Sequence, residues 1–176
     1  MAVINVEVKG NVESKGNVES KDKVEKTTVN KPRLSLAARR KARRLILQAL
    51  YQWQIARADP LEIAAQFKEE NTGKIDWEYF DEVFAEIPKQ VTDLDARLQP
   101  LLDRKQESLD PIEHALLYLG TFELANRLDI PYRVVINEAV ELAKIFGATD
   151  SHKYINGVLD KLAPSLRPIE LANRRV

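Results

Sequence analysis

The chain has 176 residues, and its 27 lysines and arginines balance 27 aspartates and glutamates, so the formal net charge is zero. It contains no cysteine, which excludes a disulfide framework and a thiolate metal site and suits a reducing cytoplasm. Its first residues lack a basic region followed by an apolar run, and it has no stretch of about 18 consecutive apolar residues. We therefore expect a cytoplasmic protein that enters no membrane.

The balanced net charge conceals an asymmetry along the chain. Between Lys26 and Ala58 nine residues are Lys or Arg and none is Asp or Glu, which leaves 18 basic against 27 acidic residues elsewhere. A charged helix face is often no more than solvated surface. A segregation of this size, however, favours nucleic acid or another acidic surface as a partner.

Residues 1–32 are predicted to form a disordered tail. Residues 5–28 repeat a six-residue pattern, NVEVKG, NVESKG, NVESKD and KVEKTT, with a valine at the second position of each repeat. A β-solenoid needs a closed apolar layer, which one valine per coil cannot supply. We interpret the repeat as a solvated, charged segment and assign it no function. A folded domain is expected over residues 33–168, and residues 169–176 are expected to be a C-terminal tail.

The first helix is predicted to begin near Ser35, a suitable N-cap, and to end at about Ala58. Its core side should consist of Ala38, Ala42, Leu45, Ile46, Ala49 and Trp53. Its opposite side carries Arg40, Arg44, Leu47, Tyr51 and Ile55, with Arg39, Lys41 and Arg43 close by at the helix start. Apolar groups that face solvent beside a basic cluster indicate a helix with a core behind it and a charged partner in front.

The next helices are marked by a sequence signal that occurs twice. Asp-Pro-x-Glu, starting at Asp59 and again at Asp110, supplies an N-cap, a first-turn proline and a capping-box glutamate. The first signal begins a short helix that ends at Glu70. A long helix follows, kinked or divided at Pro88, within a helical bundle. Its apolar seam consists of Trp77, Phe80, Phe84, Ile87, Val91, Leu94, Leu98 and Leu101.

The helix after Asp110 is apolar around most of its circumference, so we expect it to be central. Glu123 lies on its apolar side and should be paired, because an unpaired buried carboxylate is costly. One more helix follows Pro131, and a last one should run from about Asp150 to a stop at Pro164. No segment alternates with period two, so the expected fold class is all-α.

The groups needed for catalysis are sparse. His114 and His152 lie on separate predicted helices without the spacing of metal ligands. The chain has no phosphate-cradling glycine loop, no Gly-x-Ser-x-Gly elbow and no cysteine nucleophile. We therefore expect no enzymatic activity, no cofactor and no metal site.

Three segments resemble the NusB family of bacterial transcription antitermination factors. They are ARRKARRLILQALYQWQ (38–54), DPIEHALLYLGTFEL (110–124) and IPYRVVINEAVELAKIFGATDSHKYINGVLDKLAP (130–164). The resemblance covers about residues 36–168 and is weak over 60–106. It implies an all-α bundle of about seven helices in two small helical subdomains. The RNA-binding domain of some ribosomal RNA cytosine methyltransferases is also similar, but that domain continues into a catalytic one.

The resemblance also implies partners and sites. NusB proteins bind single-stranded boxA RNA of ribosomal RNA leader transcripts together with NusE, a small-subunit ribosomal protein, and the complex helps RNA polymerase read through terminators. By position, the implied RNA-binding residues are Arg39, Arg40, Lys41, Arg43, Asp150, Lys153 and Tyr154. The residues assigned to NusE binding are Tyr51 and Glu113, joined by Leu47 from the stripe that carries Tyr51.

The chemistry of these residues suits RNA, because Lys and Arg hold phosphates while bases stack on aromatic or guanidinium planes. We expect Arg40 and Tyr154 to lie close together on the protein surface, so that one RNA strand can contact both. The alternatives are that Tyr154 is a half-buried packing residue and that Tyr51 packs on the short second helix. A competing hypothesis is a protein-binding module that forms a homodimer through the stripe of Leu47, Tyr51 and Ile55.

Overall fold

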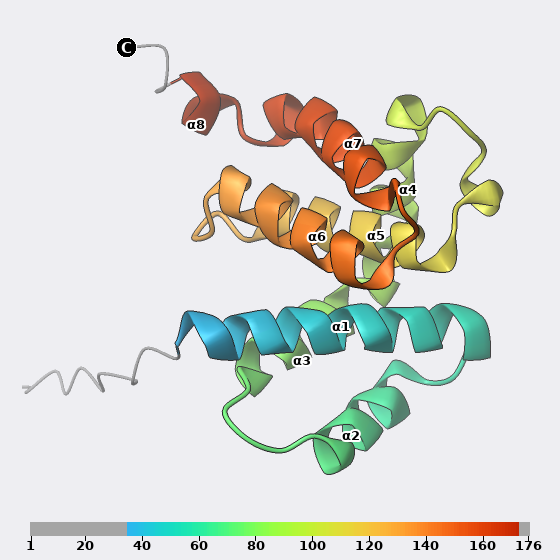
Figure 1. Cartoon of the computed structure of the whole chain (residues 1–176), viewed down its shortest axis with the longest axis vertical. Coiled ribbons are helices and arrows are strands. Elements are labelled where there is room, and N and C mark those ends of the chain that lie inside the picture. Colours follow the sequence, from blue (N-terminus) through green and yellow to red (C-terminus); the bar gives the residue numbers. More distant parts are fainter. Residues whose placement is uncertain (1–34, 173–176) are drawn as a thin grey trace, which may run out of the picture. The chain divides into compact units, whose positions relative to one another are not determined.

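The computed structural model describes residues 35–172, and the predicted tail of residues 1–32 lies outside them (Figure 1). The helices are α1 (Leu36–Ala56), α2 (Pro60–Glu70), α3 (Trp77–Glu86), α4 (Val91–Leu98), α5 (Pro111–Asn126), α6 (Tyr132–Phe146), α7 (Ser151–Leu166) and α8 (Pro168–Ala172). Short 3-10 helices occupy Pro88–Gln90, Gln99–Leu101 and Gln106–Ser108. The described residues contain no strand, and the prediction of an all-α fold is confirmed.

Side-chain caps fix the starts of several helices where the sequence predicts them. The Ser35 hydroxyl accepts a hydrogen bond from the backbone N–H of Ala38 at 3.2 Å and begins α1. Asp59 and Asp110 each accept one from the backbone two residues later, at 2.8 Å in both cases. Because the first N–H groups of a helix have no partner within it, these caps define where each helix starts.

The prolines divide one predicted helix and fail to stop another. Pro88 opens a 3-10 turn between α3 and α4, so the long predicted helix is divided there, as expected. The predicted stop at Pro164 is wrong, because α7 continues to Leu166. The N–H of Arg167 still closes the last turn on the Ala163 carbonyl at 2.8 Å, so the helix accommodates a proline near its end.

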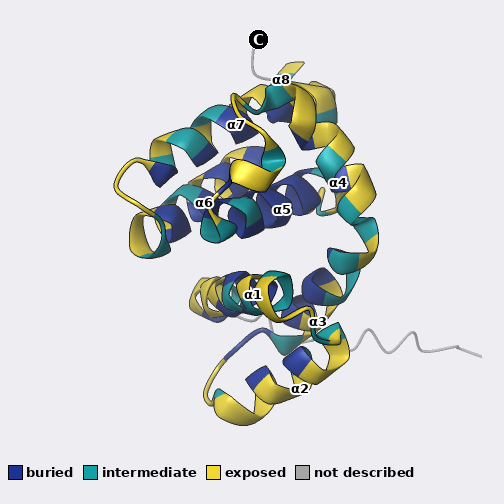
Figure 2. Cartoon of the chain, turned by 90° about the vertical axis from the view of Figure 1, so that its right-hand side faces the viewer, coloured by how far each residue is buried: buried dark blue, intermediate teal, exposed yellow. Residues whose placement is uncertain are grey.

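The helices pack in two groups that meet at α1 and α5. α1 packs against α2 and α3 on one side and against α5 on the other, while α5, α6 and α7 pack against one another (Figures 1 and 2). α5 is buried along most of its length, as its all-round apolar surface predicts. It approaches α7 closely at Gly120, where an added Cβ would lie 2.7 Å from Leu159 Cδ1.

The two-sided packing of α1 corrects one expectation about its surface. Tyr51 and Ile55 are 41% and 60% exposed, as predicted, but Leu47 is fully buried. A helix covered on two sides buries a broader band than one apolar stripe, and Leu47 falls within that band. The assignment of Leu47 to a partner-binding surface is therefore wrong.

Candidate nucleic-acid interface

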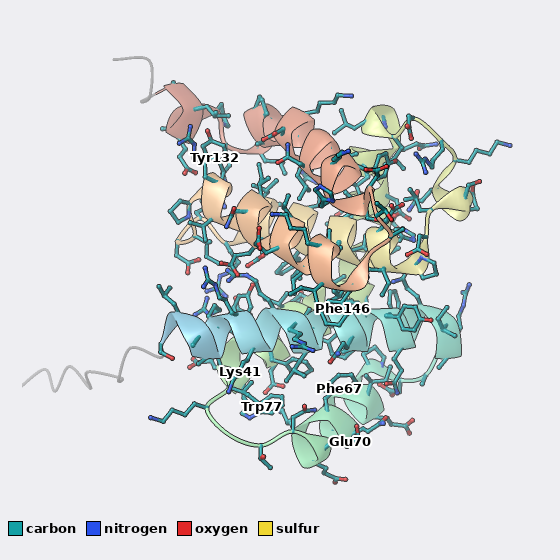
Figure 3. The ribbon with its side chains drawn as sticks, viewed as in Figure 1. Lys41, Phe67, Glu70, Trp77, Tyr132 and Phe146 are labelled. Atoms are coloured by element: carbon teal, nitrogen blue, oxygen red, sulfur yellow. The ribbon has the colours of Figure 1, made fainter. Side chains whose placement is uncertain are left out.

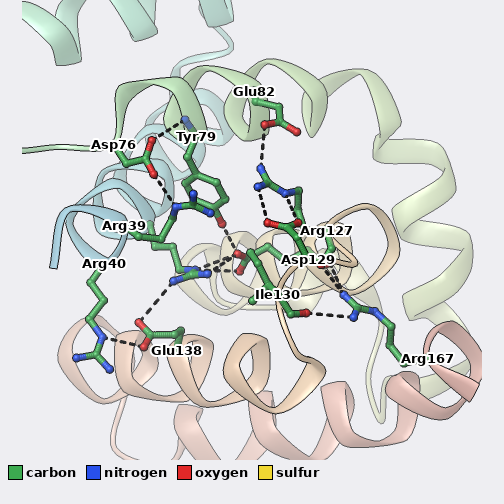
Figure 4. A network of polar contacts seen from close by, with 12 residues as sticks. Arg39, Arg40, Asp76, Tyr79, Glu82, Arg127, Asp129, Ile130, Glu138 and Arg167 are labelled. Atoms are coloured by element: carbon green, nitrogen blue, oxygen red, sulfur yellow. Dashed lines mark hydrogen bonds and ion pairs between the residues drawn. The ribbon is translucent and has the colours of Figure 1, made fainter. Parts of the chain in front are cut away.

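Arg43 is 4% exposed and therefore lies inside the molecule rather than on the basic surface. It belongs to the polar network that also contains Tyr79 and Glu138, both labelled in Figure 4. Its Nη2 is 2.9 Å from Oε1 of Glu123, and the two side chains are 5% and 2% exposed. The Tyr79 hydroxyl donates a hydrogen bond to the same carboxylate. Burial raises the pKa of Glu123, and the Arg43 charge opposes that shift. The predicted pairing of Glu123 is confirmed, but its partner is Arg43, which corrects the prediction that Arg43 binds RNA.

Arg39 and Arg40 each pair with a carboxylate and differ in what remains exposed. Arg39 Nε donates to Asp76 at 2.7 Å, and its guanidinium Cζ lies 4.1 Å from the centroid of the Tyr79 ring. Arg40 Nε donates to Glu138 on α6 at 2.8 Å, yet 64% of the Arg40 side chain is exposed. Most of the Arg40 side chain is therefore exposed to solvent, whereas the Arg39 side chain is 29% exposed and engaged in contacts with Asp76 and Tyr79.

Lys41 and Arg44 complete the basic surface of α1. Lys41 is exposed, lies on the lower side of α1 in Figure 3, and forms no ion pair with another residue of the described range. Arg44 is also exposed, and its Cζ lies 5.1 Å from the centroid of the Phe146 ring at the end of α6. Arg40 and Arg44 thus follow the seam between α1 and α6. The site prediction omitted Arg44, although its spacing of four residues from Arg40 places both on one helix face.

The predicted residues at the start of α7 form a second cluster. Lys153 Nζ lies 2.8 Å from Asp150 Oδ1, and both side chains are 73% exposed. Tyr154 is half-buried, and the guanidinium Cζ of Arg104 lies 4.6 Å from the centroid of its ring. Nothing in the sequence singles out Arg104, which comes from the stretch that resembles the NusB family least.

The two basic clusters are not neighbours. Arg40 pairs with Glu138 in the first half of α6, whereas α7 begins beyond the other end of α6. Figure 1 shows the start of α1 at the left and the start of α7 at the right. The expectation that Arg40 and Tyr154 lie close together on the surface is therefore wrong. At 1.5 Å per residue, the eight residues from Glu138 to Phe146 place the Arg40–Glu138 contact about 12 Å before the end of α6.

The residues assigned to a protein partner lie at the same end of α1 as the start of α7. One turn after the exposed Tyr51, Gln54 Nε2 donates to the carbonyl of Pro111, which opens α5. Glu113, two residues further on, is 8% exposed and accepts a hydrogen bond from Ser151 Oγ at 2.7 Å. Tyr51 is thus available to a partner, whereas Glu113 is already bound to the first residue of α7.

Tyr51 also lines an open groove between α1 and α2. The groove is lined by Gln48, Tyr51, Gln52, Ile55, Ala56, Phe67, Glu70 and Asn71. Tyr51 shares this groove with Phe67 and Glu70 of the short second helix, yet 41% of its surface stays exposed, so α2 does not cover it.

Two further observations concern other kinds of site. Between residues 35 and 172 no group of three His, Cys, Asp or Glu side chains could hold a metal ion. No helix in the same range is both long enough and apolar enough to cross a membrane.

The fold belongs to a known structural class. A solved T. maritima NusB structure matches with a TM-score of 0.67 and 27% sequence identity, over 76% of this chain and 96% of that one. A crystal structure of antitermination factors NusB and NusE in complex with dsRNA also matches, with a TM-score of 0.67, over 74% of this chain and 99% of that one. At 22% identity the second match shows likeness of fold alone. The architecture is that of the all-helical NusB structures.

Sequence comparison defines the family. The NusB family model matches residues 40–164. The transcription antitermination protein NusB of Alcanivorax borkumensis is 56% identical over 140 residues, which cover 79% of this chain and 93% of that protein. The protein of the same name from Hahella chejuensis is 52% identical and covers 78% and 93%. This chain therefore belongs to the NusB family, which confirms the resemblance seen in its sequence.

Proposed function

We propose that this chain is a transcription antitermination factor that binds single-stranded boxA RNA of ribosomal RNA leader transcripts together with NusE, and that it catalyses no reaction. Its relatives are named for antitermination, and one protein of the same fold was solved with NusE and dsRNA. The observation that carries the RNA part is the exposed pair of Arg40 and Arg44 along the α1–α6 seam, which leads towards Lys153. In this role the chain works in the cytoplasm, within the antitermination complex of RNA polymerase.

The two separated clusters suit an extended strand better than a compact ligand. Arg40 and Arg44 would hold phosphates along the seam, with Lys41 on the adjacent face of α1 and Lys153 at the start of α7, because cations position the RNA backbone without reading its sequence. Arg43 would contribute indirectly, since its ion pair with Glu123 holds α1 against α5. The RNA surface in this proposal is the length of the seam rather than one pocket.

NusE would bind at the end of α1 that carries Tyr51. An exposed tyrosine beside Ile55 and an open groove supplies the aromatic and apolar contacts typical of a binding hot spot. Glu113 would contribute indirectly to NusE binding, because it accepts a hydrogen bond from Ser151 and so holds the start of α7 in place. The partner surface and one RNA cluster thus share the start of α7, so we expect NusE and RNA each to strengthen the binding of the other.

Titration of labelled single-stranded boxA RNA, with and without NusE and at several salt concentrations, tests the proposal. If four phosphates are neutralised, the logarithm of affinity should fall with the logarithm of salt at a slope of about −3. Replacing Arg40 and Lys41 together by Ala should weaken binding while the circular dichroism spectrum stays helical.

Three controls accompany the titration. Lys68→Ala removes an exposed charge on α2, where Lys68 pairs with Asp81, and should leave binding unchanged. A scrambled strand and a double-stranded RNA of the same sequence test the choice of single-stranded boxA. A salt-independent affinity would reject the seam as the RNA surface.

A homodimer through the exposed part of the stripe is the second candidate. Tyr51 and Ile55 remain exposed, whereas Leu47 is buried, so only part of the proposed surface is available. Sedimentation of the protein alone distinguishes the two functions. A dimer that Ile55→Asp dissociates would support self-association, and a monomer would leave this surface to NusE.

A further inference from the structure

Arg104 covers the aromatic side chain to which RNA binding is assigned. It lies in the connection between the 3-10 helices Gln99–Leu101 and Gln106–Ser108, far in sequence from Tyr154 on α7. Its guanidinium Cζ is 4.6 Å from the centroid of the Tyr154 ring, which is the geometry of a cation–π contact. Two regions of the chain therefore meet to build one stacked pair.

A second contact fixes the guanidinium in this position. Arg104 Nε donates to Asp103 Oδ1 at 2.8 Å, and Nη2 lies 3.4 Å from Oδ2. The Arg104 side chain nevertheless stays 46% exposed. Asp103 and Tyr154 thus hold the guanidinium while solvent still reaches the arginine.

The same arrangement limits what Tyr154 can do alone. The ring is half-buried and packs against the hydrophobic core, and its hydroxyl is buried. The ring face beneath Arg104 is occupied. A base could lie directly on that face only after the guanidinium had left it.

We propose that Arg104 is a further RNA contact, whose guanidinium, held over the Tyr154 ring, provides the plane on which an RNA base stacks. RNA-binding proteins use arginine planes in this way, and guanidinium is weakly hydrated and stacks readily. The inference rests on the proposed RNA-binding function. It changes the role of Tyr154 from direct contact to support.

The surroundings supply cations for the flanking phosphates. Lys105 is exposed next in the chain, and Lys153 is 73% exposed one residue before Tyr154. The carboxylates of Asp103 and Asp150 are paired with Arg104 and Lys153, and Glu113, which also lies near Arg104 and Tyr154, accepts a hydrogen bond from Ser151 Oγ. An RNA strand that reaches the start of α7 would thus find a stacking plane. A lysine is next in sequence to each residue of the Arg104–Tyr154 pair.

The competing arrangement is a cover, in which a base displaces Arg104 and stacks on Tyr154 itself. Displacement would break both the Asp103 hydrogen bonds and the stacking on the ring. Stacking on the outer face of the guanidinium keeps both contacts and adds a third. The geometry therefore favours the platform over the cover.

Binding of single-stranded boxA RNA to full-length variants tests the platform. Arg104→Ala should weaken binding about tenfold, within the range measured for loss of one base–side-chain stack. Arg104→Lys keeps the charge without the plane, so it should preserve the salt slope but still weaken binding about fivefold. Lys68→Ala is the control for loss of one exposed charge, and circular dichroism checks folding.

Each result that contradicts the proposal shows which part of it is wrong. Tighter binding by Arg104→Ala would show a cover, unchanged binding would show no contact, and full affinity of Arg104→Lys would show a charge contact without stacking. If Arg40→Ala with Lys41→Ala weakens binding and Arg104→Ala does not, the platform fails while the proposed function stands. If the parent binds no RNA, both fail.

Discussion

Arg43 on α1 and Glu123 on α5 form a buried ion pair, with Arg43 Nη2 2.9 Å from Glu123 Oε1. Glu138 on α6 lies 3.8 Å from Arg43 Nη1, and the hydroxyl of Tyr79 on α3 donates to Glu123. Four helices thus meet at one cation and two carboxylates (Figure 4). The pair stabilises the packing of the RNA-binding helix rather than contacting RNA.

We expect Arg43→Met to lower the free energy of unfolding by about 3–5 kcal/mol, because it leaves the Glu123 carboxylate buried without a cation. Urea denaturation followed by circular dichroism measures the loss. Arg40→Met, which removes an arginine that is 64% exposed, is the matched control and should cost at most about 1 kcal/mol. Adding Glu123→Leu to Arg43→Met should restore part of the stability. Equal losses in the two single variants would contradict the structural role of Arg43.

Glu138→Gln should tighten RNA binding about two- to fivefold, because the carboxylate competes with phosphate for the exposed Arg40 guanidinium. Fluorescence anisotropy with boxA RNA measures the change. Glu141→Gln, on the same helix but paired with Lys144, is the control and should leave the affinity as it is. A weaker complex for Glu138→Gln would mean that Glu138 positions Arg40 for RNA instead of competing with it.

Leu47→Ala should lower the free energy of unfolding by about 2–5 kcal/mol, because Leu47 is fully buried and its truncation leaves a cavity. Ile55→Ala, at a position that is 60% exposed, should change stability little and weaken NusE binding instead. Denaturation and a NusE binding assay on both variants separate the two roles. Loss of NusE binding by a fully stable Leu47→Ala variant would restore Leu47 to the partner surface.

His114 should make stability depend on pH below neutrality. Burial lowers its pKa below the ordinary 6.5, more than the nearby Asp95 raises it, so the unfolded chain binds more protons between the two pKa values. Stability rises with pH wherever the unfolded state binds more protons. The contribution of neutral His114 is therefore complete above about pH 6.5 and is lost as the pH falls through 6.5 towards the folded pKa. Denaturation at pH 7.5, 6.5 and 5.5 should show a steeper loss for the parent than for His114→Gln.

Much of the fold follows from local sequence signals. Ser35, Asp59 and Asp110 cap helices where they were expected to, because a cap depends on residues only two or three positions away. Pro88 divides a helix for an equally local reason, its missing N–H. The predicted helix stop at Pro164 was wrong because the last turn of α7 tolerates the missing N–H of a proline.

The candidate site was less predictable from the sequence. A helical wheel gives the direction in which each side chain points from the helix axis, but not which other residues the side chain meets there. Arg40 and Arg43 are three residues apart in one basic run, yet one is 64% exposed and the other 5%. The difference is made by Glu123, which is 80 residues away in sequence from Arg43. The contact of Arg104 with Tyr154 could not be predicted from the sequence for the same reason, because only folding brings the two residues together.

The sequence alone determined the helical class, the helix starts, the family and the concentration of positive charge in the first helix, all of which depend on neighbouring residues or on similarity along the chain. Only the tertiary structure decided which of those charges reach solvent and how far they lie from the start of α7. The physical reason is that a buried charge needs an opposite charge beside it, and in this protein Glu123 and Arg43 meet only when α5 packs against α1.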